Sequence, residues 1–203
     1  MEHTVNRITL RGSLQTLPEF SHENHGRKFL KFFLEVPRLS GAVDVLPILA
    51  EEKILGPLDP TAGGMLLVSG QIRTHNNREN GVRRLIIYVF AECIQLEDGE
   101  PINDVYLEGP ICKEPIYRKT PLGRQICDVM LAVPRQFRRA AYIPCILWGR
   151  TAQEIAGCQI RECIRIQGRL QSRVYTKVTE AGSEERTAYE VSALHADILE
   201  EIL

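Results

Sequence analysis

The residues with the clearest chemistry are three arginines and a tyrosine near residue 170. Arg165, Arg169 and Arg173 recur at every fourth position, and Tyr175 continues the same odd-numbered series. Because successive side chains of a β-strand point to opposite faces, we expect this series on one face and an apolar series on the other. Guanidinium groups in a row beside an aromatic ring suit a groove that follows a phosphate backbone and stacks bases, although a solvated arginine face is the competing interpretation. The expected inward series is Ile164, Ile166, Gly168, Leu170, Ser172 and Val174, and the outward series is Arg165, Gln167, Arg169, Gln171, Arg173 and Tyr175.

A second segment places two aromatic residues on one strand face. Tyr142 and Trp148 alternate with Ile143, Cys145 and Leu147, which form a wholly apolar opposite face. A core position or a subunit interface would also accommodate an aromatic residue here. Basic and aromatic residues on neighbouring strands of a small barrel are nevertheless typical of single-stranded nucleic-acid binding, in which stacking contributes about 1–3 kcal/mol per base.

Charge is divided unevenly along the chain. The total of 25 Lys and Arg against 26 Asp and Glu gives a net charge of -1. Residues 109–177 nevertheless hold thirteen basic and four acidic side chains, a net +9, whereas residues 12–79 hold seven and eight, a net -1. A local field of this kind attracts polyanions, so nucleic acid is expected in the second half.

The two halves are copies of one sequence. A displacement of 97 aligns residues 6–38 with 103–135 without a gap, and after one inserted residue 68–70 align with 166–168. Trp148 then corresponds to Glu51 and Tyr142 to Val45, so the first copy lacks the aromatic face. The duplication predicts a first domain at 1–97, serving as scaffold or dimerisation unit, an acidic linker at 97–101, and a nucleic-acid-binding domain at 103–203.

Each copy shows short strand signals broken by glycine and proline, with one short helical segment. In the second copy the expected strands cover 103–113, 125–135, 142–148, 164–175 and 186–197, and the helix covers 151–156. Five strands with a helix between the third and fourth are the element order of the OB fold. The predicted fold class is all-β, with two tandem five-stranded OB-fold barrels and one short helix in each.

Several other classes are disfavoured. The six cysteines form no C-x2-C pair, and the five histidines lie near no nucleophile or carboxylate at a suggestive spacing, so we expect no metal, no cofactor and no enzymatic activity. No apolar run reaches the roughly 20 residues that span a bilayer, and no secretion signal begins the chain. We therefore expect reduced thiols, no membrane partner and a cytoplasmic location.

The second copy resembles the bacterial single-stranded DNA-binding protein family. Matching runs lie at 103–109, 115–123, 131–135, 142–152, 168–175 and 189–191, and the most specific is the segment Gly-Arg-Leu-Gln-Ser-Arg-Val-Tyr at 168–175. The resemblance implies an OB fold and sequence-tolerant binding of single-stranded DNA in replication, recombination or repair. It also implies stacking by Tyr142, Trp148 and Tyr175, with Phe137 in a neighbouring loop. The candidate binding residues are Arg118, Lys119, Arg135, Phe137, Arg138, Arg139, Tyr142, Trp148, Arg150, Arg165, Arg169, Arg173 and Tyr175.

Two departures from the family pattern matter. Most family members carry one barrel per chain and assemble four, so a chain with two barrels would reach four as a homodimer. Most also end in a flexible tail with an acidic tip that recruits other proteins, which this sequence lacks, so no recruitment through a tail is expected. The alternatives are a primosomal-type OB protein, an RNA-binding OB protein and a protein-interaction scaffold that binds no nucleic acid.

Overall fold

The same order of elements occurs twice along the chain. The computed structural model describes residues 5–56, 58, 60–61, 63–79, 82–135, 139–179 and 182–199. The first half contains β1 (Asn6–Leu14), β2 (Glu19–Asn24), β3 (Arg27–Pro37), β4 (Val43–Glu51), α1 (Glu52–Leu55), β5 (Met65–Glu79) and β6 (Val82–Leu96). The second half contains β7 (Ile102–Pro110), β8 (Ile116–Lys119), β9 (Gln125–Arg135), β10 (Arg139–Trp148), α2 (Gly149–Ile155), β11 (Cys163–Thr179) and β12 (Gly182–Ile198). Within the described residues, no helix is long and apolar enough to cross a membrane.

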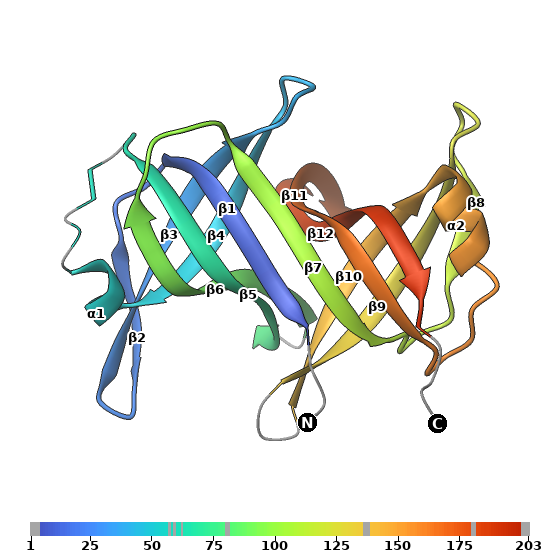
Figure 1. Cartoon of the computed structure of the whole chain (residues 1–203), viewed down its shortest axis with the longest axis horizontal. Coiled ribbons are helices and arrows are strands. Elements are labelled where there is room, and N and C mark those ends of the chain that lie inside the picture. The colour runs from blue at the N-terminus through green and yellow to red at the C-terminus, as the bar shows by residue number, and fades with distance from the viewer. Residues whose placement is uncertain are drawn as a thin grey trace.

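Strand pairing closes each half into a five-stranded barrel. In the first half β1 pairs with β5 and β3, β5 with β6, β6 with β4, and β4 with β3, which completes a ring. In the second half β7, β11, β12, β10 and β9 follow one another, and a bridge between Ile111 and Leu131 joins the end of β7 to β9. The inward side chains of all these strands form an apolar core. The prediction of an all-β chain with two tandem OB-fold barrels is confirmed (Figure 1).

An asparagine that both copies share binds the backbone of a neighbouring strand. The Asn6 side chain donates to the Ile72 carbonyl at 2.8 Å and accepts from the Ile72 N–H at 2.9 Å. Asn103 makes the same pair of hydrogen bonds with Leu170, at 2.7 and 2.9 Å. Each asparagine therefore satisfies two backbone groups of a neighbouring strand and ties β1 to β5 or β7 to β11.

The two barrels join edge to edge through β1 and β7. Asn6 pairs with Leu107 and Leu10 with Asn103, and since these are equivalent positions of the repeat, the register is the same from either barrel. The strands run antiparallel through the middle of the molecule, so one sheet continues across both barrels (Figure 1). Residues 97–101 connect β6 to β7.

Two features of the predicted strands are wrong. Val174, expected inside, is 64% exposed, and Gln171, expected outside, is only 8% exposed. Beyond Gly168, β11 no longer pairs with β7, and it continues with β12 as a protruding hairpin as far as the Thr179–Gly182 pair. We call this hairpin beyond Ser172 the arm, and neither of its faces covers the barrel core.

Candidate nucleic-acid interface

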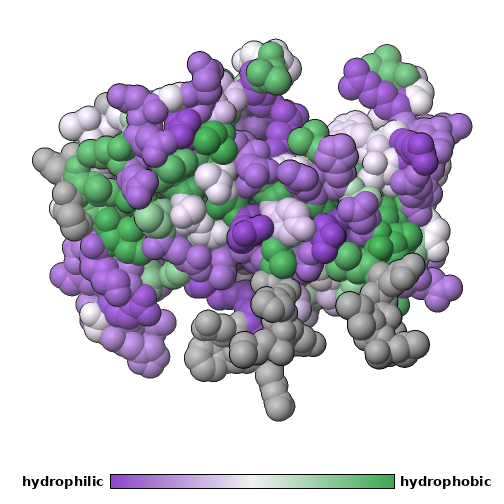
Figure 2. Space-filling model, in the orientation of Figure 1, coloured by the Kyte–Doolittle hydropathy of each residue, from purple (hydrophilic) through white to green (hydrophobic). Residues whose placement is uncertain are grey.

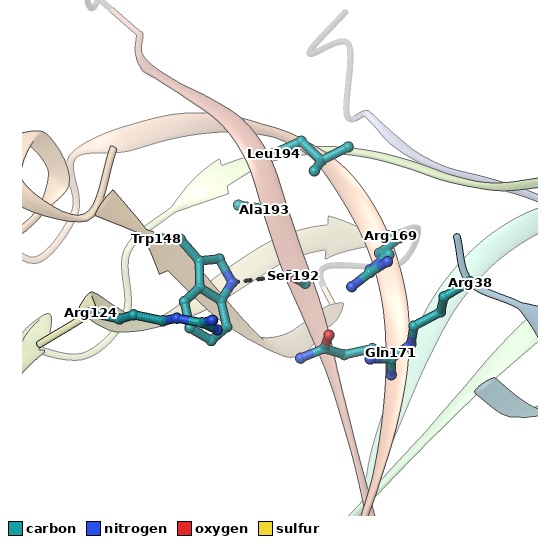
Figure 3. Close-up of a pocket in the computed structure, with 8 residues that line it drawn as sticks. All are labelled: Arg38, Arg124, Trp148, Arg169, Gln171, Ser192, Ala193 and Leu194. Atoms are coloured by element: carbon teal, nitrogen blue, oxygen red, sulfur yellow. Dashed lines mark hydrogen bonds between the residues drawn. The ribbon is translucent and has the colours of Figure 1, made fainter. Parts of the chain in front are cut away.

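A groove of about 580 Å³ lies on the second barrel beside the arm. Its walls come from the residue just before β9, the end of β10 and the middle of β11 and β12, together with one residue that follows β3 of the first barrel. The lining residues are Arg38, Arg124, Trp148, Arg169, Gln171, Ser192, Ala193 and Leu194 (Figure 3).

Trp148 is held by its polar edge and stays accessible. It is the last residue of β10 and is 37% exposed, and its indole Nε1 donates to Ser192 Oγ at 3.1 Å. Arg124 lines the same groove as the indole (Figure 3). A turn fixes Arg124, because its backbone N–H donates to Thr120 Oγ1 at 3.0 Å just after Gly123 at a φ of +78°. An indole with one bonded edge and an accessible ring suits stacking on a flat apolar surface.

The guanidinium group of Arg169 lines the groove, and not all of its donors form hydrogen bonds among the described residues. Its side chain is half-buried, and its Nε atom is buried without a hydrogen-bond partner among the described residues. Gln171, two residues along β11, donates from Nε2 to Glu190 Oε1 at 2.8 Å. An unpaired buried donor costs roughly 1–3 kcal/mol, so an acceptor that reaches Arg169 is favoured. Phosphate oxygens are strong acceptors for guanidinium groups.

Two of the other aromatic candidates, Tyr142 and Tyr175, lie outside the groove lining. Tyr175 is 38% exposed on the arm, with Arg173 Cζ at 5.7 Å from its ring centroid. Tyr142 is 46% exposed on β10, six residues and hence about 20 Å from Trp148. The Tyr142 backbone N–H donates at 2.8 Å to Thr74 Oγ1 of the first barrel. The structure thus presents Trp148 in the groove, Tyr175 on the arm and Tyr142 near the first barrel.

Three of the candidate arginines already have carboxylate partners. Arg165 pairs with Glu108 at 2.7 Å, and Arg118 pairs with Asp128 at 2.8 Å. The pKa of each of these two guanidinium groups is raised, chiefly by the hydrogen bond that it donates to its carboxylate partner. Arg150 pairs with Glu154 at 2.8 Å across one turn of α2. Exchange of the exposed partners of Arg118 and Arg150 for phosphate is inexpensive, since surface ion pairs contribute little stability.

The remaining basic candidates are more dispersed. Lys119 and Arg139 are exposed. Arg135 lies close enough to Arg73 of the first barrel to lower the pKa of Arg73, although burial of Arg73 is the larger cause. The Arg135 charge therefore lies near the first barrel. Phe137 and Arg138 lie outside the described residues.

The groove also contains residues that the sequence did not single out. Arg124 was counted only as part of the basic stretch, although its repeat with Arg27 was a signal that the position matters. Arg38 belongs to the first copy, and its presence here depends on how the barrels join. In the described part of the chain, no group of three histidine, cysteine or acidic side chains could hold a metal ion.

The equivalent surface of the first barrel is occupied by its own side chains. Glu51 stands at the position of Trp148 and pairs with Arg27, and Lys53 approaches it at 3.1 Å. The pKa of Glu51 is lowered, chiefly by its hydrogen bond with Arg27. Arg73 stacks on Phe90, with Cζ at 3.5 Å from the ring centroid. A carboxylate in the place of the indole repels a polyanion.

Comparison with known proteins places the second barrel in a family. The model of the single-strand binding protein family matches residues 102–199. Single-stranded DNA-binding protein B of Bacillus subtilis is 38% identical over 80 residues, which cover 36% of this chain and 71% of that protein. The chain belongs to the single-strand binding protein family. The names of these relatives refer to DNA binding and not to an enzymatic reaction.

Other relatives extend the comparison. Single-stranded DNA-binding protein A of Bacillus subtilis is 36% identical over 81 residues, 36% of this chain and about half, 47%, of that relative. The crystal structure of the wild-type single-stranded DNA binding protein from Thermus aquaticus matches with a TM-score of 0.79 and 20% identity, over 97% of this chain and 94% of that one. A deletion mutant of the Thermus protein matches with a TM-score of 0.81 and 20% identity, over 100% and 98%. The Thermus structures show that the whole fold, both barrels included, has a known counterpart.

Proposed function

We propose that the chain binds single-stranded DNA with little sequence preference, through the groove and arm of the second barrel, in replication, recombination or repair. The observation that carries the proposal is an accessible Trp148 held beside two cations, Arg124 and Arg169. An aromatic platform next to guanidinium groups offers stacking to a base and charge to a phosphate, which every nucleotide supplies. The names of the relatives support single-stranded DNA as the ligand. A protein with this role would act in the cytoplasm with the DNA.

The first barrel supports the second without binding DNA through its own equivalent surface. Glu51 occupies the place of the stacking residue, and its pairing with Arg27 neutralises the cation that corresponds to Arg124. We propose residues 1–97 and 103–203 as the units of this division of labour, and the closure of strands within each half supports the proposal.

Titration of the intrinsic fluorescence tests the proposal, because Trp148 is the only tryptophan. Oligo(dT) at low salt should quench its emission. Binding of labelled oligo(dT), followed by anisotropy, should weaken by about 1–3 kcal/mol in Trp148→Ala through loss of one stacked base.

A matched control is Phe20→Ala, which removes a 60% exposed aromatic side chain from β2 of the first barrel. This variant should bind like the unaltered chain. An emission spectrum that stays the same at saturation would remove Trp148 from the interface.

RNA is the second candidate ligand, since stacking and phosphate contacts are common to both nucleic acids and only contacts to the 2′-hydroxyl distinguish them. Competition between oligo(dT) and oligo(U) separates the two. We expect oligo(dT) to displace oligo(U) at lower concentration. A scaffold that binds neither would show no salt-sensitive association with either one.

We further propose a homodimer that brings four barrels together. Symmetric closure is the common form of such assemblies, and the first barrel offers its surface without a ligand of its own. Light scattering at micromolar concentration should return twice the chain mass of 23.0 kDa. A mass of one chain would refute the dimer.

A further inference from the structure

The boundary between the barrels has some contacts that occur on both of its sides and others that occur on one side only. Two hydroxyl hydrogen bonds cross it in equivalent places of the repeat. Val45 N–H donates to Ser172 Oγ at 3.1 Å, and Tyr142 N–H donates to Thr74 Oγ1 at 2.8 Å. At the repeat offsets of 97 and 98, Val45 corresponds to Tyr142 and Ser172 to Thr74. To this extent the boundary is symmetric.

An ion pair breaks this symmetry on the side of the groove. Asp44 is fully buried and accepts from Arg38 Nε at 2.8 Å and from the Ser172 backbone N–H at 2.7 Å. Arg38 Nη2 also donates to the Ser172 carbonyl at 3.1 Å. The position equivalent to Asp44 in the second copy is the buried Ala141, so a carboxylate is missing at this position on the other side.

Ser172 is the residue at which β11 leaves its own barrel. β11 pairs with β7 only as far as Gly168, and the Asn103 side chain then binds the backbone of Leu170. From Ser172 onward, β11 continues to pair with β12 of the same barrel but no longer pairs with β7. The contacts of Arg38 and Asp44 therefore hold β11 between the groove residue Gln171 and the arm residue Arg173.

We propose that Arg38 and Asp44 of the first barrel form a clamp on Ser172 that sets the direction of the arm relative to the groove. This proposal rests on the proposed function, because it states how the first barrel completes the binding surface of the second. Arg38 itself lines the groove (Figure 3), yet Asp44 compensates its charge. The Arg38–Asp44 pair belongs to the first copy, and it positions Tyr175 and Arg173 of the second copy.

Removal of Asp44 separates this role from a simple effect of charge. Asp44→Ala adds one unit of positive charge to the molecule and frees Arg38 at the groove. If Arg38 acted only as a cation, DNA would bind more tightly. With a clamp lost, the arm loses its direction and we expect oligo(dT) to bind about 2- to 30-fold more weakly, in the range by which residues without ligand contact alter binding.

Strand length provides a readout that general destabilisation would not. A strand long enough for the groove alone does not reach the arm, whereas a longer one does. Across oligo(dT) from about 5 to about 16 nucleotides, the span bound by single OB folds, the unaltered chain should gain affinity with length. Asp44→Ala should keep the affinity for the shortest strands and lose most of that gain.

A second variant covers the case in which Asp44→Ala does not fold, which circular dichroism would show. Asp44→Asn has nearly the same shape and keeps one oxygen for the Ser172 N–H, so it should bind long strands with an affinity between those of the unaltered chain and Asp44→Ala. The matched control is Glu97→Ala, which also adds one positive charge by removing the partner of Arg11. It should bind no more weakly than the unaltered chain.

The outcomes are distinct. Tighter or unchanged binding of long strands by the folded Asp44 variants overturns the clamp and leaves the proposed function intact. A loss of affinity equal at all lengths also overturns it, since that result would indicate a general structural role. If the unaltered chain does not bind oligo(dT), the proposed function fails, and the clamp fails with it.

Discussion

Gly70 and Gly168, which are equivalent in the two copies, lie where a side chain has no room. A Cβ at Gly168 would lie 2.2 Å from the Ser192 carbonyl oxygen, and one at Gly70 would lie 2.1 Å from the Phe90 carbonyl oxygen. In both barrels the strand register shifts beside the glycine, between Gln167 and Gly168 in β11. The backbone contact that excludes a Cβ also sets the position of Ser192, which holds the indole of Trp148.

Gly168→Ala should therefore affect both stability and binding. The methyl group forces β11 away from β12, and we expect a loss of unfolding free energy of about 1–3 kcal/mol or more, typical of strain in a packed region. The urea midpoint of unfolding measures the first effect, and weaker quenching of Trp148 by oligo(dT) measures the second.

Gly157→Ala is the matched control, because no atom lies within 4 Å of its Cβ position. It should change stability by no more than about 0.5 kcal/mol. Equal midpoints for the two variants would contradict the role assigned to the close backbone contact.

Single residues were predictable from the sequence where alternation applies. Trp148 and Arg169 were singled out from strand parity, and both line the groove. Parity failed at Val174 because it gives the face of a strand and not the point at which the strand leaves its barrel. Arg38 could not be found, since its place in the groove arises from contacts between the copies.

At the scale of elements, the sequence located the long strands and missed the short ones. β9 begins and ends where the pattern placed it, at Gln125 and Arg135. β2 and β8 were not predicted, because every residue of both strands is exposed and no apolar alternation marks them. Their hairpins depend on turns with Gly26 and Gly123 at φ of +72° and +78°. The space-filling view shows mainly hydrophilic residues over the β2–β3 hairpin (Figure 2).

The edge of β7 provides a prediction about the isolated second barrel. Without β1, β7 would present unpaired N–H and C=O groups, which readily pair with another chain. The β1–β7 register is the same from either barrel, so two copies of β7 can replace it. A fragment of residues 101–203 should therefore form a dimer through β7, with a mass by light scattering twice that of the fragment.

The control for this measurement is the circular dichroism spectrum, which must show that the fragment is folded. Tyr106→Asp would place a carboxylate opposite Asp104 of the second copy of the fragment, because Tyr106 pairs with the equivalent of that residue in β1, and this like-charge pair should return a folded monomer. A folded fragment that stays monomeric without this change would contradict the self-complementary register.

At the scale of the whole molecule, affinity should depend strongly on salt. If Z phosphates are neutralised, the logarithm of the binding constant should fall against the logarithm of salt concentration with a slope of about -0.7Z. Arg169→Ala and Arg173→Ala should each reduce the slope by somewhat under one unit and weaken binding to all sequences alike, because phosphate contacts carry no base information.

Lys28→Ala removes an exposed cation from the first barrel and serves as the control, with little change expected in the slope. Binding of duplex as tightly as single strands would contradict the assignment to the groove.

The uneven distribution of charge and the presence of two barrels could be predicted from the sequence. The contacts between the two barrels across a common sheet could not be predicted, because no local sequence pattern encodes how one copy packs on the other.

The register of β1 and β7 is symmetric, but only one side of the boundary carries an aspartate. A dimer of identical barrels shows every surface twice, related by rotation, so its two binding paths run in opposite directions. When one polypeptide encodes both barrels, each position can change alone. Within one chain, the groove then leads to one arm, so a strand bound along it can have a fixed 5′-to-3′ polarity.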